Sequence, residues 1–139
     1  MIDDIILNKK ESIERCVRQI NIYYKQETGL SFEQDHLKQD AIAINIQRAA
    51  EQCIDLANHV VRIQKLGIPK ESKDGFVMLA DAKIIPQDLS GKLIKMVGFR
   101  NILVHQYQEL EIKIMQDIIE NHLEDFIDFT KRVMENSPP

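Results

Sequence analysis

The stretch that decides the fold is residues 41–66, AIAINIQRAAEQCIDLANHVVRIQKL. Apolar side chains recur along it at steps of three and four residues, which is the spacing of one buried face of an α-helix. The members of this stripe are Ala41, Ile42, Ile46, Ala49, Ala50, Cys53, Leu56, Ala57, Val60 and Ile63. Ser31 and Gln34 have the spacing of a capping box and predict the start of the helix, while Gly67 and Pro69 predict its end. A helix of roughly thirty residues is about 45 Å long, so we expect it to be the spine of the domain.

Three further long helices and one short helix are expected around this spine. The same apolar spacing marks residues 2–27, 86–105 and 111–134 as long helices and residues 74–83 as a short one. Five glycines and four prolines are few for a chain of 139 residues, which favours long helices over many short strands. We therefore predict an all-α fold, an antiparallel helical bundle of four long helices plus one short helix.

The length and charge of the chain set further limits. A length of 139 residues suits a single helical domain over residues 1–135, with residues 136–139 as a frayed tail. The net charge of −4 gives no general basic footprint for nucleic acid, although the cleft of a nuclease can carry the opposite sign from the surface as a whole. Asp3 and Asp4 stand where a signal peptide carries positive charge, and no apolar run is long enough to span a bilayer. We expect a cytoplasmic protein with no membrane partner.

The cysteines and histidines indicate no metal or redox site. Cys16 and Cys53 lie among apolar neighbours and form no Cys-x-x-Cys pair, so we interpret them as small buried hydrophobic residues. His36, His59 and His122 are scattered and lack the spacing of zinc ligands. We therefore expect no metal ion and no cofactor.

Residues 100–107, RNILVHQY, place Arg, Asn, His and Tyr within eight residues of a segment that otherwise has the pattern of a buried helix. Arginine offers a permanent charge and a planar fork for phosphate oxygens, and histidine can take or give a proton near neutral pH, so the pair suits phosphodiester chemistry. At about 100° per residue, Arg100, Val104 and Tyr107 share one helix face, whereas His105 points about 140° away from Arg100. One site that uses both side chains needs a helix that ends or bends near His105, or two copies of the stretch that face each other. On spacing alone, a surface pair or a charge complement at a helix C-terminus is the more common explanation.

Residues 100–107 resemble the R-x4-H-x-Y signature of HEPN-domain proteins, specifically the HepT toxins of bacterial and archaeal toxin–antitoxin pairs. Residues 96–99, 39–41, 45–49 and 55–59 resemble the same family in the same order. The resemblance implies a HEPN-like helical bundle that forms a homodimer, with the two motifs in one cleft, and a metal-independent endoribonuclease activity. It also implies that Arg100 holds the phosphate and that His105 acts as general acid or base. Asn101 would orient the phosphate or the histidine.

The family resemblance also implies a partner and a mode of control. HepT toxins pair with a minimal nucleotidyltransferase antitoxin of the MntA type in a type VII-like toxin–antitoxin system, and that antitoxin transfers AMP to the tyrosine of the signature. Tyr107 would be the acceptor in this sequence, and the bulky negative adenylyl groups would repel an RNA backbone.

Two other interpretations remain open. The polar stripe formed by Arg48, Glu51, Asp55 and His59 is explained equally well as a solvated, salt-bridged helix face and as a border of the dimer cleft that orients Arg100. The whole protein can also be a non-catalytic helical dimerisation or binding module that serves as partner and substrate of a nucleotidyltransferase.

Overall fold

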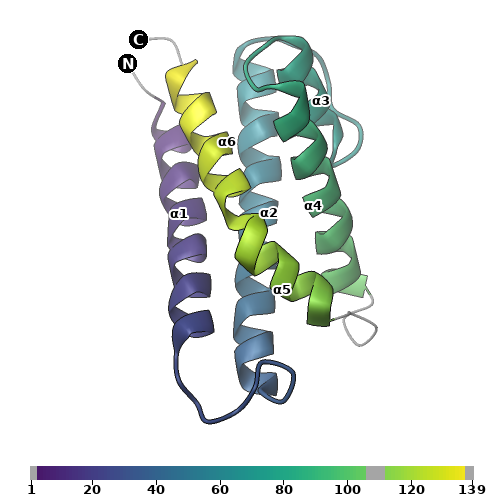
Figure 1. Cartoon of the computed structure of the whole chain (residues 1–139). Coiled ribbons are helices and arrows are strands. Elements are labelled where there is room, and N and C mark those ends of the chain that lie inside the picture. Colours follow the sequence, from purple (N-terminus) through teal and green to yellow (C-terminus); the bar gives the residue numbers. More distant parts are fainter. Residues whose placement is uncertain (1–2, 106–111, 137–139) are drawn as a thin grey trace.

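The computed structural model describes residues 3–105 and 112–136, which fold into six helices with no strand among them (Figure 1). The helices are α1 (Asp4–Lys25), α2 (His36–Ile63), α3 (Asp74–Asp81), α4 (Gln87–His105), α5 (Ile112–Asn121) and α6 (Leu123–Glu135). The predicted all-α bundle is confirmed. The predicted count of five helices is wrong, because the last long helix is two.

The spine of the bundle is α2, as the apolar stripe predicts. Its stripe is buried from Ile42 to Val60, but Ile63, the last member, is 40% exposed. The predicted start of the helix is too early, since Asp35 rather than Ser31 is the N-cap residue, and its carboxylate accepts the backbone N–H of Lys38 at 3.0 Å. The hydroxyl of Ser31 instead accepts the N–H of Gln34 in the turn that precedes the helix. The capping-box spacing therefore closes a turn.

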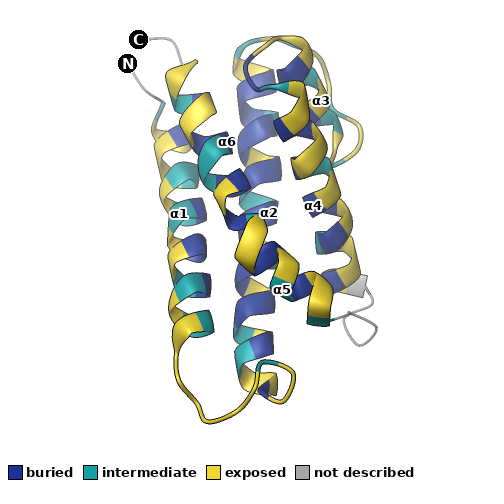
Figure 2. Cartoon of the chain, viewed as in Figure 1, coloured by how far each residue is buried: buried dark blue, intermediate teal, exposed yellow. Residues whose placement is uncertain are grey.

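The other helices cover α2 from two sides (Figure 1). Helix α1 packs along α2 on one side, and α3 and α4 pack against it on the other. Helix α6 crosses between the two sides and contacts α1, α2 and α4. The core is continuous: Phe76 of α3 meets Phe129 of α6 edge to face, with ring centroids 5.5 Å apart. Figure 2 shows that α2 is buried along most of its length, whereas the outer helices expose their far faces.

The predicted helix over residues 111–134 breaks at His122. The backbone of His122 has φ −127° and ψ 1°, which lies outside the helical region, and α6 begins at the next residue. The imidazole lies 3.1 Å from Asp125 and 3.4 Å from Asp117, so the side chain is held between the two helices. The break lets α5 and α6 run in different directions (Figure 1).

The C-terminal end of the helical unit reaches one residue beyond the predicted domain boundary. Asn136 was expected in the frayed tail, but its side-chain amide donates to the carbonyl oxygens of Ile84 at 3.2 Å and Arg132 at 2.9 Å. These hydrogen bonds join the end of α6 to the connection between α3 and α4. The remaining tail residues, 137–139, lie outside the described residues. No helix in the described part of the chain is long and apolar enough to cross a membrane.

Candidate active site

The arginine of the motif lies on the inner side of α4, near its C-terminal end. Arg100 is half-buried, and its Nη2 donates to the hydroxyl of Ser72 at 3.1 Å. Its Nε is buried and has no hydrogen-bond partner among the described residues. A guanidinium group has only donors, and a buried donor without a partner is costly, so this nitrogen is a strong candidate to bind an anionic oxygen.

Of the four residues that follow Arg100, three are exposed and one is buried. Leu103 is buried at 6% exposure, whereas Asn101 is exposed and Ile102 and Val104 are 37% and 43% exposed. Position 105 is the last residue of α4. The side chain of His105 and the whole of Tyr107 lie outside what the structure describes, so the expected roles of both residues stay predictions.

A rigid turn holds Ser72 in place. The carboxylate of Asp74 accepts the backbone N–H groups of Lys70 and Glu71, both at 2.9 Å. These two bonds hold the pKa of Asp74 below its usual value, the bond from Glu71 contributing most. Gly75 follows at the start of α3 and packs so closely on α2 that an added Cβ would lie 2.7 Å from Oδ1 of Asn58. The turn is therefore fixed from within and against the spine.

The polar stripe of α2 does not contact Arg100 in the described part of the chain. Asp55 lies 3.4 Å from the ammonium group of Lys9 on α1, and Glu51 accepts from Gln47 of its own helix at 3.2 Å. Arg48 is exposed, and its charge opposes the rise that burial causes in the pKa of Cys16 on α1. The interpretation of this stripe as a salt-bridged helix face agrees with these contacts.

His59, the fourth residue of that stripe, is buried at 7% exposure in a chain of polar contacts. Its Nδ1 lies 2.9 Å from the guanidinium of Arg62, which can only donate, so Nδ1 accepts and Nε2 carries the proton. Nε2 then donates to Asp3 at 2.7 Å. This bond, helped by the N–H of Ile5, holds the pKa of Asp3 below its usual value of 3.8. In the described part of the chain, His59 therefore fastens the start of α1 to α2, and the alternative that it borders a dimer cleft or orients Arg100 stays a prediction.

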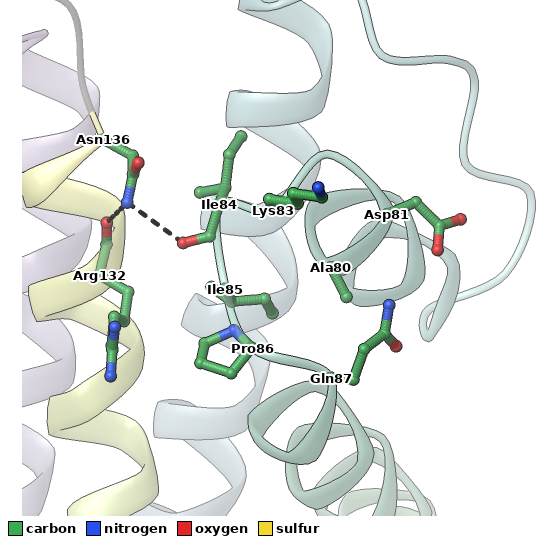
Figure 3. Close-up of a pocket in the computed structure, with 9 residues that line it drawn as sticks. All are labelled: Ala80, Asp81, Lys83, Ile84, Ile85, Pro86, Gln87, Arg132 and Asn136. Atoms are coloured by element: carbon green, nitrogen blue, oxygen red, sulfur yellow. Dashed lines mark hydrogen bonds between the residues drawn. The ribbon is translucent and has the colours of Figure 1, made fainter.

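Three hollows of the described surface lie beside Arg100 and Asn101. A hollow of about 570 Å³ lies at the other end of α4, where Asn136 bridges to the connection after α3 (Figure 3). Nearer to the motif, a hollow of about 240 Å³ between α2 and α4 includes Leu103, and one of about 410 Å³ between α4 and α5 includes Phe99. None of these three is lined by Arg100 or Asn101.

Metal ligands do not gather anywhere in the described residues. No group of three or more histidine, cysteine, aspartate or glutamate side chains there has the geometry to hold a metal ion. Cys16 and Cys53 are both buried and free, as expected, and burial raises the pKa of both thiols, that of Cys53 well above its ordinary value.

Residues 13–133 match the family described as Ribonuclease HepT-like. The chain belongs to this family. It is 49% identical over 127 residues to the mRNA nuclease HepT of Shewanella oneidensis, an alignment that covers 91% of this chain and 94% of that protein.

Solved structures extend the similarity of this HepT-like chain to its fold. The tri-AMPylated HEPN toxin of Shewanella oneidensis, in complex with its MNT antitoxin, superposes with a TM-score of 0.91 at 46% identity, over 97% of this chain and all of that one. A toxin–antitoxin structure with AMP-PNP superposes with a TM-score of 0.90 at 46% identity, over 96% of this chain and 100% of that chain. YutE of Bacillus subtilis, a cytosolic protein of unknown function, is only 20% identical but has the same fold, with a TM-score of 0.76 over 95% and 93% of the two chains.

Ser72 is the one site residue that the sequence did not reveal. It lies 28 positions before Arg100, in a segment whose composition indicates only a polar connection. No spacing rule links a hydroxyl in the loop before α3 to α4, the second helix after it, because that contact depends on how α3 and α4 pack. Asn101, in contrast, was expected at the site and is exposed beside Arg100.

Proposed function

We propose that this HepT-like chain is an RNA-cleaving toxin whose active site uses Arg100, His105 and Asn101. The observation that carries the proposal is the half-buried Arg100 with its unpartnered Nε, in a chain 49% identical to an mRNA nuclease. Arg100 binds the scissile phosphate, and His105 acts as general acid or base. With RNA, the 2′-OH gives its proton to a base and attacks the adjacent phosphorus, the P–O5′ bond breaks, and the 5′-oxygen leaves as a protonated hydroxyl, which gives a 2′,3′-cyclic phosphate and needs no metal ion.

The proposed site is composite, with each copy of a homodimer contributing residues. The outward face of α4 supports this, because Gly91 and Gly98 have open space where a Cβ would lie, and Asn101 and Ile102 are exposed further along it. Gly98 lies seven residues, or two helical turns, after Gly91; Asn101 and Ile102 follow Gly98 at steps of three and four, and position 105 continues the series. A second copy packed on this face would bring the two motifs together, whereas Arg100 is held on the inner side by its own chain.

The first test is RNA cleavage by two variants, each with a matched control. His105→Ala and Arg100→Ala are expected to lose cleavage and toxicity while the oligomeric state in solution stays as in the wild type. His36→Ala and Arg18→Ala remove the same side chains at exposed positions on α2 and α1 and are expected to cleave normally. A His105→Ala protein as active as the parent would overturn the proposal.

A mixing experiment tests the composite site. Arg100→Ala and His105→Ala chains are unfolded together and refolded, so that half of the dimers are mixed. If arginine and histidine act from different copies, each mixed dimer keeps one of two intact pairs, and the mixture recovers about a quarter of the wild-type rate. If both act from the same copy, no activity returns. Recovery above the sum of the separate variants therefore separates the two arrangements.

The proposed control is AMP transfer to Tyr107 by an MntA-type nucleotidyltransferase antitoxin. A relative crystallised with its antitoxin is tri-AMPylated, which supports the proposal. Incubation with the partner and ATP, followed by intact-mass spectrometry, is expected to show the mass of one adenylyl group or a multiple of it. Tyr107→Phe abolishes the gain, whereas Tyr23→Phe on α1 keeps it. A gain that survives Tyr107→Phe would remove Tyr107 from this role.

The second candidate function is a non-catalytic module that binds the nucleotidyltransferase and accepts AMP. The relatives solved together with an antitoxin favour a stable complex, which both candidates share. Cleavage separates them: an adenylylated protein whose unmodified form cleaves no RNA is the binding module, and an unmodified form that cleaves through His105 is the toxin.

A further inference from the structure

We infer that Ser72 is a positioning residue for Arg100 and sets the direction in which its guanidinium meets a phosphate. The hydroxyl oxygen accepts from Nη2 at 3.1 Å and so fixes one corner of the planar group. Because the guanidinium is rigid, fixing one nitrogen also fixes the plane on which Nε lies. Nε is buried and has no partner among the described residues, so it is a free donor for a phosphate oxygen once RNA binding uncovers it. The inference rests on the proposed function, since it assumes that Arg100 binds the phosphate.

The turn that carries Ser72 is built as a fixed support. Asp74 accepts two backbone N–H groups at 2.9 Å, one on each of the two residues before Ser72. Phe76, two residues after Asp74, is 1% exposed and stacks edge to face on Phe129. The hydroxyl of Ser90 on α4 donates to the carbonyl of Phe76 at 3.1 Å, which ties this segment to the helix that bears Arg100. A hydroxyl on such a support is preorganised, which is what an orienting residue requires.

The inference is tested with steady-state RNA cleavage by Ser72→Ala and Ser72→Thr. Loss of the hydroxyl is expected to lower kcat about tenfold, the rate equivalent of about 1.4 kcal/mol, with little change in KM. Threonine keeps the hydroxyl and is expected to stay within about threefold of the wild type. The control is Ser31→Ala, which also removes a loop hydroxyl, one that accepts the backbone N–H of Gln34 and makes no hydrogen bond to Arg100 in the described part of the chain, and it is expected to leave kcat unchanged. Thermal unfolding separates a loss of stability from a loss of rate.

A double substitution shows whether Ser72 acts through Arg100. Arg100→Lys keeps the charge but has no planar fork for the hydroxyl to orient, so Ser72→Ala is expected to cost less than twofold in that background. An equal tenfold loss in both backgrounds contradicts a positioning role. A Ser72→Ala protein that cleaves as the wild type does, while Arg100→Ala cleaves nothing, overturns the inference and leaves the proposed function intact. If Arg100→Ala cleaves normally, both fall.

NMR tests the role of Arg100 in the wild-type protein and so does not depend on whether a variant folds. The Nε–H resonance of Arg100 is followed by NMR while an oligodeoxynucleotide, which lacks the attacking 2′-OH, is added. Binding of a phosphate at Nε is expected to move this resonance and to leave that of the exposed Arg18 in place. An Arg100 resonance that stays fixed at saturating ligand contradicts the inference.

Discussion

Two glycine-to-alanine substitutions are expected to change stability in opposite directions. Gly75 is the second residue of α3 and faces α2. An added Cβ would lie 2.7 Å from Oδ1 of Asn58 and 3.1 Å from Cβ of Ala57. Gly91 lies on the outward face of α4 with nothing within 4 Å of an added Cβ. Neither has a positive φ, so alanine fits the backbone at both positions. Only the space around the new methyl group differs.

The magnitudes follow from that difference. In an exposed helix, glycine costs about 0.5–1 kcal/mol relative to alanine, so Gly91→Ala is expected to stabilise a single chain by about that amount, measured at a protein concentration at which the chain is monomeric. The same gain applies at Gly75, but overpacking costs about 1–3 kcal/mol, because Ala57 lies on the spine and cannot move freely. The net effect of Gly75→Ala is a loss of up to about 2 kcal/mol. The two variants then differ by the overpacking cost, about 1–3 kcal/mol.

The assay is urea unfolding followed by far-UV circular dichroism, at one fixed protein concentration because a dimer's stability depends on it. Asn58→Ala combined with Gly75→Ala removes the closest contact and is expected to recover most of the added loss, measured against Asn58→Ala alone. If Gly75→Ala is as stable as the wild type, α3 does not pack on α2 as described. If it loses stability equally with and without Asn58, the contact with Ala57 carries the cost.

Three further predictions concern charge, thiols and metal ions. Asp3→Asn is expected to be less stable than the wild type at neutral pH; because the folded pKa of Asp3 is lowered, the difference persists above 3.8 and disappears as the pH falls through the folded value, which urea unfolding across pH 3–7 checks. Iodoacetamide at about pH 8 is expected to modify Cys16 and Cys53 slowly in the native protein, the rate falling about tenfold for each unit by which the pKa of the thiol is raised. In urea both thiols are expected to react at the normal rate. Fast labelling of the native protein contradicts their burial. RNA cleavage is expected to continue unchanged in excess EDTA, and a loss that Mg²⁺ restores would contradict the metal-independent mechanism.

The helices were predictable from sequence because burial on one face leaves a periodic trace. The stripe of α2 is buried as predicted up to Val60, since each of its members faces a neighbouring helix. The ends were harder to predict, because several polar residues compete to cap the same helix. Ser31 has the right spacing, but Asp35 takes the cap, and the same carboxylate accepts the hydroxyl of Thr28 at 2.6 Å. That second bond depends on how the preceding loop folds back.

The break at His122 left no trace in the sequence for a related reason. The apolar stripe runs without interruption from Met115 to Phe126, and no glycine or proline marks the junction. The backbone leaves the helix there because α6 packs against α1 and α2, while α5 lies beside α4. Asp117 and Asp125 then hold the imidazole between the two helices. Tertiary packing selects the break, and local preference only permits it.

The site itself divides into a part that spacing predicts and a part that it cannot. Helical geometry alone places Arg100 and His105 on different faces, and the structure agrees to the extent that Arg100 is half-buried while its neighbour Asn101 is exposed. Which element receives Arg100 was not predictable, because Ser72 reaches it only through the packing of α3. The partner of His59 was not predictable for the same reason: polar residues on one helix stripe face different neighbours, and only the fold decides that His59 meets Asp3.

The two sides of α4 make different contacts within the motif. The inner side anchors: Arg100 binds Ser72 of its own chain, and Leu103 is buried at 6% exposure. The outer side, with Asn101 and Ile102, is available to another molecule. In the proposed function, an arginine that is fixed by its own bundle gains orientation, and the histidine has to come to it. Spacing leaves two arrangements open, a helix that ends or bends near His105 and a second copy of the motif, and refolding of mixed Arg100→Ala and His105→Ala chains separates them.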